Sequence, residues 1–188
     1  MRNFFLHNTV TFLLKRSIAI GFLSLCLIAN IDLCAQTPTK EYQVKAVFLF
    51  NFSQFVDWPP AAFSSSNAPF IIGIVGHDPF GSYIDETVAG EKMMGHPIKI
   101  LRCENKEDIK DCHILFIGYD QSAEEIISAL DNRSVLTVSD ETDFARRGGM
   151  IRFFTENNKI RFEVNTSAAK AARLDISSKL LRVAQIAE

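Results

Sequence analysis

The chain has 188 residues, and its 20 Lys and Arg side chains against 22 Asp and Glu give a formal net charge of −2. A charge so near zero excludes a broad basic face for nucleic acid. Hydrophobic residues make up 47% of the chain and charged residues 22%, which excludes intrinsic disorder and predicts a folded domain.

The first 35 residues have the organisation of a secretory signal peptide. Three basic residues precede an apolar run at 17–29, which is shorter than the roughly 20 residues of a membrane-spanning helix. We therefore predict cleavage after Ala35 and an exported domain at 36–188. The alternatives are an uncleaved anchor or a helix on the membrane surface. Lipidation of Cys34 is disfavoured, because the residues before it are not small.

Residues 41–57 (EYQVKAVFLFNFSQFVD) place apolar side chains at helical spacing on several faces, and they predict a helix that is buried on most sides. Pro59 and Pro60 cannot continue this helix, and the Ser-rich stretch at 59–69 is predicted to be a surface loop. The main apolar stripe is formed by Val44, Val47, Phe48, Phe52, Phe55 and Val56.

After this loop the period of the pattern changes. Four short, branched apolar runs are typical of strands that are covered on both faces, and helical segments separate them. The predicted strands are 70–75, 98–101, 114–117 and 135–138, and the predicted helices are 82–88, 106–110 and 123–130. This alternation predicts an α/β fold with a mostly parallel sheet and flanking helices.

The C-terminal third departs from this alternation. Residues 150–155 and 159–164 alternate apolar and polar side chains around the turn residues 156–158, which predicts an antiparallel β-hairpin at the edge of the sheet. Two helices are predicted to follow, at 168–173 and 179–187. Their expected N-caps are Thr166 or Ser167 for the first helix and Ser177 or Ser178 for the second.

A turn with three glycines follows the first strand, at 73–81. Phosphate-binding loops occupy this place in α/β folds, but the turn has neither the G-x-G-x-x-G nor the G-K-[ST] spacing. The preferred interpretation is a strand-to-helix turn that Asp78 caps. The alternative is a small-molecule site that uses Gly76, His77 and Asp78 in the crevice at the carboxyl ends of the strands.

The residue patterns indicate neither catalysis nor a bound metal. His77, His96 and His113 show no short metal-ligand spacing with one another or with the cysteines. The sequence contains no G-x-S-x-G, no H-E-x-x-H and no close carboxylate pair that would select a catalytic group. We therefore assign no catalytic residue, no metal ligand and no cofactor.

The densest basic stretch of the exported part is Arg146-Arg147-Gly148-Gly149. The preferred interpretation is a solvated turn whose glycines let the chain reverse into the hairpin. The alternative is a surface for a partner or an anion, formed by Phe144, Arg146 and Arg147, because bases stand beside an aromatic residue there. Three acidic residues just upstream would neutralise part of its charge.

Cys103 and Cys112 remain after removal of the predicted leader, and an even number of cysteines suits an oxidising compartment. If the strands at 98–101 and 114–117 are parallel neighbours, the two cysteines lie at opposite ends of the sheet, beyond the roughly 7 Å Cα separation of a disulfide. A parallel crossover, however, usually takes about a dozen residues or more, and fewer separate these cysteines. The sequence therefore leaves their pairing open.

Six stretches carry a set of landmarks in a fixed order. They are KAVFLFNFSQFVDWP at 45–59, the G-x-D-P-F-G turn at 76–81, CHILFI at 112–117, DFARRGGMIRF at 143–153, IRFEVN at 160–165 and LDISSKLL at 174–181. Together they resemble the YfiR-type periplasmic family, over essentially all of residues 36–188. The resemblance implies a single periplasmic α/β domain.

The resemblance further implies a regulator without enzymatic activity. Proteins of this type bind the periplasmic sensory part of a membrane diguanylate cyclase and hold it inactive until envelope or redox stress releases it, and other members accompany sensor kinases. For this chain the resemblance implies that the partner is such a cyclase or kinase and that the protein contacts the membrane only through it. The resemblance is also compatible with a homodimer. Disulfides support the fold of the best-known member, which has more cysteines, so a redox role does not carry over.

Three functions therefore compete. The first is the exported regulatory binding protein, the second a periplasmic small-molecule-binding domain that uses the crevice near residues 76–81, and the third an enzyme with an unrecognised site. The first predicts co-purification with a membrane signalling protein, the second a ligand-dependent rise in melting temperature, and the third turnover of a substrate.

Overall fold

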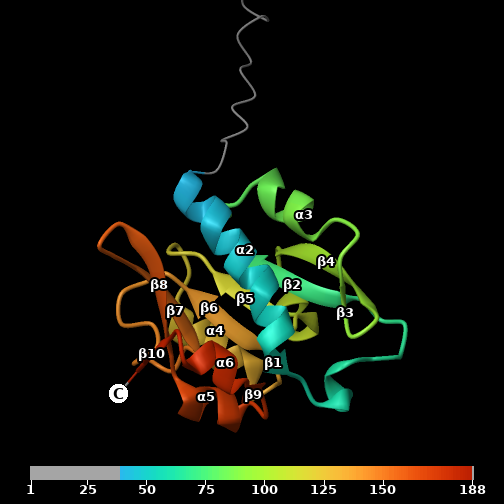
Figure 1. The fold of residues 1–188 in the computed structure, drawn as a ribbon. Helices are drawn as coiled ribbons and strands as arrows, with labels where there is room; N and C mark the ends of the chain where they lie inside the picture. The colour runs from blue at the N-terminus through green and yellow to red at the C-terminus, as the bar shows by residue number, and fades with distance from the viewer. Residues whose placement is uncertain (1–38, 188) are drawn as a thin grey trace, which may run out of the picture. The chain divides into compact units, whose positions relative to one another are not determined.

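The computed structural model describes residues 39–187, and a sheet of eight strands lies at its centre (Figure 1). The strands of this sheet are β2 (Phe70–Val75), β3 (Lys92–Met93), β4 (His96–Cys103), β5 (Ile114–Ile117), β6 (Leu136–Ser139), β7 (Ile151–Glu156), β8 (Lys159–Val164) and β10 (Gln185–Ile186). A separate antiparallel pair is formed by β1 (Val56–Asp57) and β9 (Asp175–Ile176). The prediction at 1–35 lies outside the described residues.

Five neighbouring strands are parallel, in the order β4-β2-β5-β6-β7. Counted along the chain this is the order 2-1-3-4-5 of flavodoxin-like sheets, with the switch in winding direction between β2 and β5. All residues of β5 and β6 are buried, as expected of strands covered on both faces. The predicted α/β fold with a mostly parallel sheet is confirmed.

Helices cover both faces of this sheet. They are α2 (Lys40–Phe55), α3 (Ser82–Val88), α4 (Ala123–Leu130), α5 (Thr166–Ala171) and α6 (Ser178–Leu181), with short 3₁₀ turns η1 (Pro60–Ala62) and η2 (Asp108–Asp111). One core cluster joins α2, α3 and α5 to the sheet, and a second joins α4 and η2 to its other face. Figure 1 shows α2 running across the front of the sheet and α4 behind it.

The predicted hairpin is present as β7 and β8, with Phe153 opposite Phe162. It extends the sheet, and only the two residues of β10 lie beyond it. The predicted helix at 179–187 is wrong beyond its first turn: α6 ends at Leu181, and Gln185 and Ile186 pair with β8. A segment this short has little helical stability of its own, so strand pairing decides its conformation.

The N-cap of α5 also differs from the prediction. Asn165, one residue before the expected Thr166 or Ser167, accepts a hydrogen bond from the Ala168 backbone at 2.9 Å. Its side-chain amide donates to the Ala145 carbonyl at 2.8 Å, so the same residue also binds the loop between β6 and β7. The helix therefore begins at Thr166, with Asn165 as its N-cap. The predicted cap at Ser177 is confirmed for α6.

The helix predicted at 41–57 is confirmed as α2, but the prediction that most of its sides are buried is wrong. Val44 is 44% exposed, Val47 40% and Phe55 36%. The buried stripe instead contains Leu49 and Phe52. Because apolar residues occur on every face of this helix, their spacing does not identify the face that packs.

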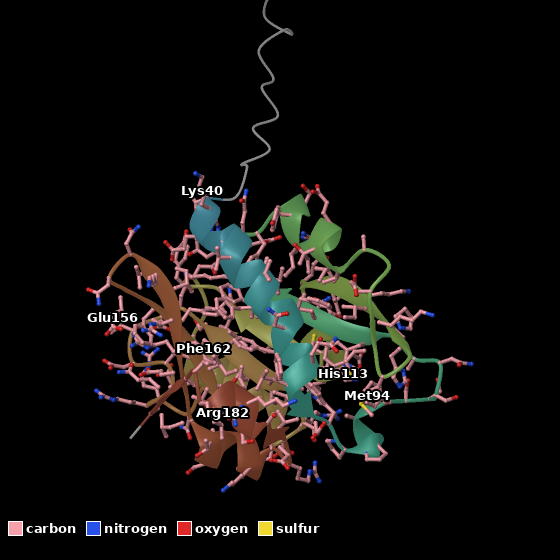
Figure 2. All side chains as sticks on the ribbon, in the orientation of Figure 1. Lys40, Met94, His113, Glu156, Phe162 and Arg182 are labelled. Carbon is pink, nitrogen blue, oxygen red and sulfur yellow. The ribbon has the colours of Figure 1, made fainter. Side chains whose placement is uncertain are left out.

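Four phenylalanine rings fasten α2 to the hairpin. Phe52 stacks on Phe153 with ring centroids 5.7 Å apart, and it meets Phe162 edge to face at 5.3 Å. Phe48 contacts the same two rings, and Figure 2 labels Phe162 at this place in the core. Such pairs add to the stability that burial of the rings provides. Phe48 and Phe52 are therefore structural.

Candidate functional site

The carboxyl ends of β2 and β5 meet where the sheet changes its winding direction, which is the place of the predicted crevice. Gly76 has a φ of +78°, and a Cβ at this position would collide with the carboxylate of Asp120. The same carboxylate accepts a hydrogen bond from the His77 backbone at 2.7 Å. A side chain of the protein itself therefore occupies the space over the Gly76 backbone.

Asp78 organises the turn before α3. One of its carboxylate oxygens accepts hydrogen bonds from the backbone of Phe80 at 2.8 Å and of Gly81 at 3.2 Å. The other oxygen accepts from Arg102 at 2.8 Å. Both oxygens are thus engaged within the protein. The prediction that Asp78 caps the helix is wrong, because the N-cap of α3 is Gly81 and no side chain caps it; Asp78 instead stabilises the turn before the helix.

An exposed aromatic side chain lies beside this turn. Tyr119, in the loop after β5, is 69% exposed, and its ring lies 4.9 Å from that of His77. Tyr119 is not predicted as a site residue, because a single tyrosine in a loop carries no motif. Only the parallel pairing of β2 with β5 brings these two rings to the same edge of the sheet.

Arg146 and Arg147 lie in the turns after β6, at this same edge. Arg146 makes an exposed, 3.7 Å ion pair with Asp143. Arg147 contacts Glu141 at 2.6 Å and Glu124 at 3.2 Å, and the Glu141 carboxylate raises the pKa of this guanidinium. The acidic residues upstream therefore neutralise part of the basic stretch, as the sequence predicts.

Phe144 does not belong to that surface, and its assignment there is wrong. Its side chain is fully buried, at 0% exposure, in the core cluster that joins α4 to the sheet. A Cβ on Gly149 would collide with the Phe144 ring, so this glycine makes room for it. The alternation of charged and apolar residues in a turn does not reveal that the ring points inward.

Cys103 and Cys112 lie together on one face of the sheet, with their sulfur atoms 3.8 Å apart. The assumption that 98–101 and 114–117 are neighbouring strands is wrong, because β2 lies between them. Gly73 of β2 has no side chain to separate the two sulfur atoms. The hydrogen bond between the thiols lowers the pKa of Cys103 and raises that of Cys112, and burial raises the latter further.

An ionic network around the buried Lys45 joins α2 to the end of β6. Lys45 is 2% exposed, and its ammonium lies 2.7 Å from Asp140 and 2.6 Å from Glu41. The hydroxyl of Tyr42 donates to the same Asp140 oxygen at 2.8 Å. Burial and this hydrogen bond raise the pKa of Tyr42. All four polar groups are thus satisfied by one another, which fits a structural role for the network.

His113 is a buried ring at the opposite, amino edge of the sheet (Figure 2). Its Nδ1 accepts a hydrogen bond from the Ile71 backbone at 3.1 Å, and its ring packs on Phe63 and Phe70. Burial, followed by the charge of His96, lowers the pKa of His113 to about 4. The imidazole is therefore neutral at pH 7.

This shift predicts a pH-dependent stability. The His113 ring takes up a proton near pH 6.5 in the unfolded chain but only near pH 4 in the folded protein. Between these values the folded state binds fewer protons, so lowering the pH favours unfolding. We expect the urea midpoint to fall more steeply between pH 6.5 and 4 in the wild type than in His113→Gln, with His77→Gln as the matched control. Equal slopes in the wild type and His113→Gln would contradict this.

The strand order defines a flavodoxin-like α/β domain. Ion pairs such as Asp78–Arg102 and Arg147–Glu141 hold the loops at the carboxyl edge of its sheet. Within residues 39–187, no helix is long and apolar enough to cross a membrane, and no three His, Cys, Asp or Glu side chains gather as metal ligands would. The model of the family described as DUF4154, YfiR/HmsC-like, matches residues 42–185, and the chain belongs to this family. Its members are periplasmic regulatory proteins.

The likeness to solved structures is weaker. The crystal structure of a conserved domain protein from Vibrio cholerae O1 biovar El Tor aligns with a TM-score of 0.45 and 13% sequence identity. The alignment covers 63% of this chain and 54% of that one, so the chain spans about half the length of the Vibrio protein. No curated protein matches the chain. The family assignment therefore rests on the match to the family model.

Proposed function

We propose that the protein is an exported regulator that binds the periplasmic sensory part of a membrane diguanylate cyclase and holds it inactive, with a sensor kinase as the alternative partner. The family membership of residues 42–185 carries this proposal. The predicted signal peptide at 1–35 accounts for export. Repression of this kind needs no catalytic group, because a protein that binds one conformation of its partner more tightly shifts the partner's population toward it.

We place the partner contact at the carboxyl edge of the sheet. The carboxyl-edge surface is defined as His77, Tyr119, Arg146 and Arg147. Tyrosine and arginine side chains contribute most of the binding energy in many protein interfaces. Tyr119 is 69% exposed and supported from one side by the His77 ring, so little conformational freedom is lost when it is covered.

The two arginines differ in their availability to a partner. Arg146 is two-thirds exposed, and its distant pair with Asp143 is of the kind that adds little stability. Arg146 can therefore exchange Asp143 for an acidic group of the partner at small cost. Arg147 is held in place by Glu124 and Glu141, and it presents a fixed edge of the same surface.

Affinity capture from detergent-solubilised envelope tests this proposal. We expect the wild type to retain a diguanylate cyclase, and the double variant Arg146→Glu/Arg147→Glu to retain at least ten-fold less of it. Arg161→Glu, a charge reversal at the exposed pair with Glu156 on the hairpin, is the control that keeps wild-type capture. Unchanged capture by the double variant would overturn the surface. Wild-type capture of no signalling protein would overturn the function.

We further propose that Cys103 and Cys112 are joined by a disulfide in the exported protein. Their sulfur atoms already lie 3.8 Å apart with no side chain between them. In the denatured protein we expect no free thiol before reduction and two after it. The bond closes a short loop, so reduction should lower the free energy of unfolding by about 2–3 kcal/mol. Two thiols that react before reduction would contradict the pairing.

A further inference from the structure

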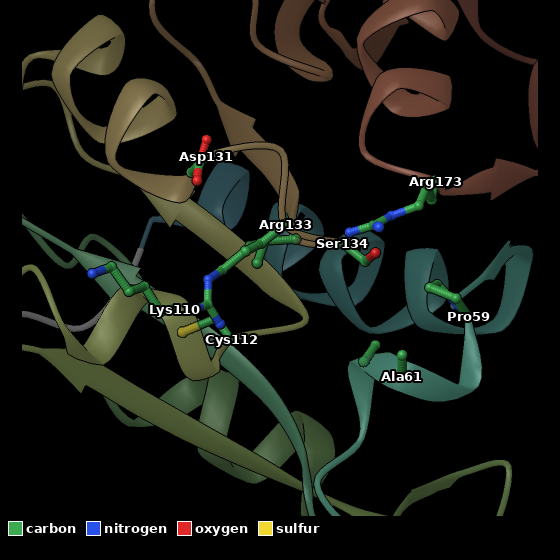
Figure 3. Close-up of a pocket in the computed structure, with 10 residues that line it drawn as sticks. Pro59, Ala61, Lys110, Cys112, Asp131, Arg133, Ser134 and Arg173 are labelled. Atoms are coloured by element: carbon green, nitrogen blue, oxygen red, sulfur yellow. The ribbon is translucent and has the colours of Figure 1, made fainter.

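A pocket of 550 Å³ opens at the amino ends of β5 and β6. This is the edge of the sheet opposite the carboxyl-edge surface. Its volume lies within the roughly 300–1,000 Å³ of small-molecule sites. Residues on its wall include Pro59, Lys110, Cys112, Arg133, Ser134 and Arg173 (Figure 3). A second hollow of 400 Å³ shares Lys110 and Arg133 and extends the wall to His113. We call the two together the basic pocket.

Two guanidinium groups of the basic pocket have no partner. Within residues 39–187, neither Arg133 nor Arg173 makes an ion pair or a side-chain hydrogen bond, whereas Arg102, Arg147 and Arg152 all do. Figure 3 shows Arg173 extending toward Ser134 and Arg133 extending toward Cys112. The two bases come from different turns of the chain, so the fold brings them to one wall.

The other charges of the basic pocket leave these two arginines unbalanced. Lys110 is engaged with Glu107 at 2.9 Å. Asp131 stands at the rim, away from Arg173 in Figure 3, and Asp111 lines the adjoining hollow. Among the described residues, neither Asp111 nor Asp131 lies within ion-pair distance of Arg133 or Arg173. An anion that enters the pocket therefore meets free donors.

Arg173 stands at a helix end that favours glycine. Its backbone N–H donates to the Lys170 carbonyl at 2.9 Å, and the Leu174 N–H donates to the Ala169 carbonyl at 2.9 Å, which are the two bonds of a Schellman motif. The motif requires a left-handed residue at this point, and Arg173 has a φ of +61°. Glycine adopts this conformation without steric cost, and a long side chain does not.

His113 lines the adjoining hollow with a neutral ring. Its Nδ1 accepts a hydrogen bond, so the neutral ring carries its proton on Nε2. Nε2 exposes no surface, and no hydrogen bond of good geometry reaches it among the described residues, although the Ala62 carbonyl lies near enough to act on the pKa of the ring. The neutral ring lines the hollow that continues the pocket without adding a charge to it.

We propose that the basic pocket binds a small molecule through an oxyanion group, a carboxylate or a phosphate, held between Arg133 and Arg173. Guanidinium groups present paired N–H donors that match the oxygens of these anions, and the Ser134 hydroxyl offers another donor beside Arg173. This site lies at the amino edge of the sheet and does not depend on the proposed partner. It also differs from the predicted crevice at 76–81, where the Asp120 carboxylate lies over Gly76.

Titration of the purified protein with inorganic phosphate and with succinate, each at low ionic strength, tests the proposal. We expect saturable shifts in the amide NMR signals around the pocket. Arg133→Gln and Arg173→Gly should each weaken binding at least ten-fold. Arg161→Gln, which removes an exposed base on the hairpin, should bind as the wild type does. The probe that binds more tightly identifies the oxyanion.

Arg173→Gly also separates loss of binding from loss of folding. Because glycine relieves the left-handed strain, we expect this variant to melt a few degrees higher than the wild type without a probe, while losing the rise that the probe produces. Absence of saturable binding of both probes to the wild type would overturn the proposal. Wild-type affinity in both Arg133→Gln and Arg173→Gly would overturn it as well.

Discussion

Asp140→Ala is expected to lower the free energy of unfolding by about 3 kcal/mol, because it removes the more buried of the two carboxylates that pair with the ammonium of Lys45. Lys45 is 2% exposed and lies 2.7 Å from the Asp140 carboxylate. Breaking a buried ion pair costs about 3–5 kcal/mol, and Glu41 remains to offset part of it. The variant also removes the acceptor of the Tyr42 hydroxyl. Urea unfolding followed by circular dichroism measures the loss.

Lys45→Met should cost less, about 1 kcal/mol, although it breaks the same pair. Methionine fills a similar volume without a charge, and Asp140 keeps its bond to Tyr42 and some exposure to water. Lys106→Met is the control, because its pair with Glu125 is mostly exposed and should change stability by less than about 0.5 kcal/mol. A loss in Lys45→Met as large as in Asp140→Ala would contradict burial of the charge.

One residue of the sequence indicates this network, although the spacing of apolar residues does not. Lys45 is the one basic residue between Glu41 and Asp57, in a helix whose neighbouring positions are apolar. A charge inside such a stretch is compatible with folding only if it reaches a partner. The partner is almost a hundred residues away, and its identity follows from the sheet order, which places the end of β6 beside α2.

The parallel sheet is predictable because its strands are covered on both faces, which makes their sequences continuous apolar runs. The order of these strands is not encoded locally. For this reason the proximity of Cys103 and Cys112 could not be predicted: β2 enters between β4 and β5, and Gly73 then leaves room for both sulfur atoms. The short β10 escapes prediction for a similar reason, since its conformation depends on pairing with β8.

The basic pocket is still less accessible to sequence analysis. Its walls come from the turn after α2, from η2 and from the turns after α4 and α5, which are separated by many residues along the chain. Arginine also gives no sign of a left-handed conformation, which glycine or asparagine at position 173 would have indicated. A motif can be identified in a sequence, but this pocket consists of residues that form no motif.

Phe144→Ala is expected to destabilise the protein by about 4 kcal/mol, within the roughly 3–5 kcal/mol of large-to-small changes at buried phenylalanines. The side chain is fully buried between α4 and the sheet. Were Phe144 instead a surface contact, the variant would lose partner binding and keep its stability. Arg146→Ala, two residues away and exposed, is the matched control and should stay within about 0.5 kcal/mol of the wild type in urea unfolding.

Substitution of Gly149 tests the contact between this glycine and the Phe144 ring. A Cβ at Gly149 would collide with the Phe144 ring, so Gly149→Ala alone should cost about 1–3 kcal/mol through overpacking. In the Phe144→Ala background the ring is gone and the added methyl group enters the cavity. The double variant should therefore be more stable than the sum of the two single losses implies, by at least about 1 kcal/mol. Additive losses would show that the ring and the glycine do not touch.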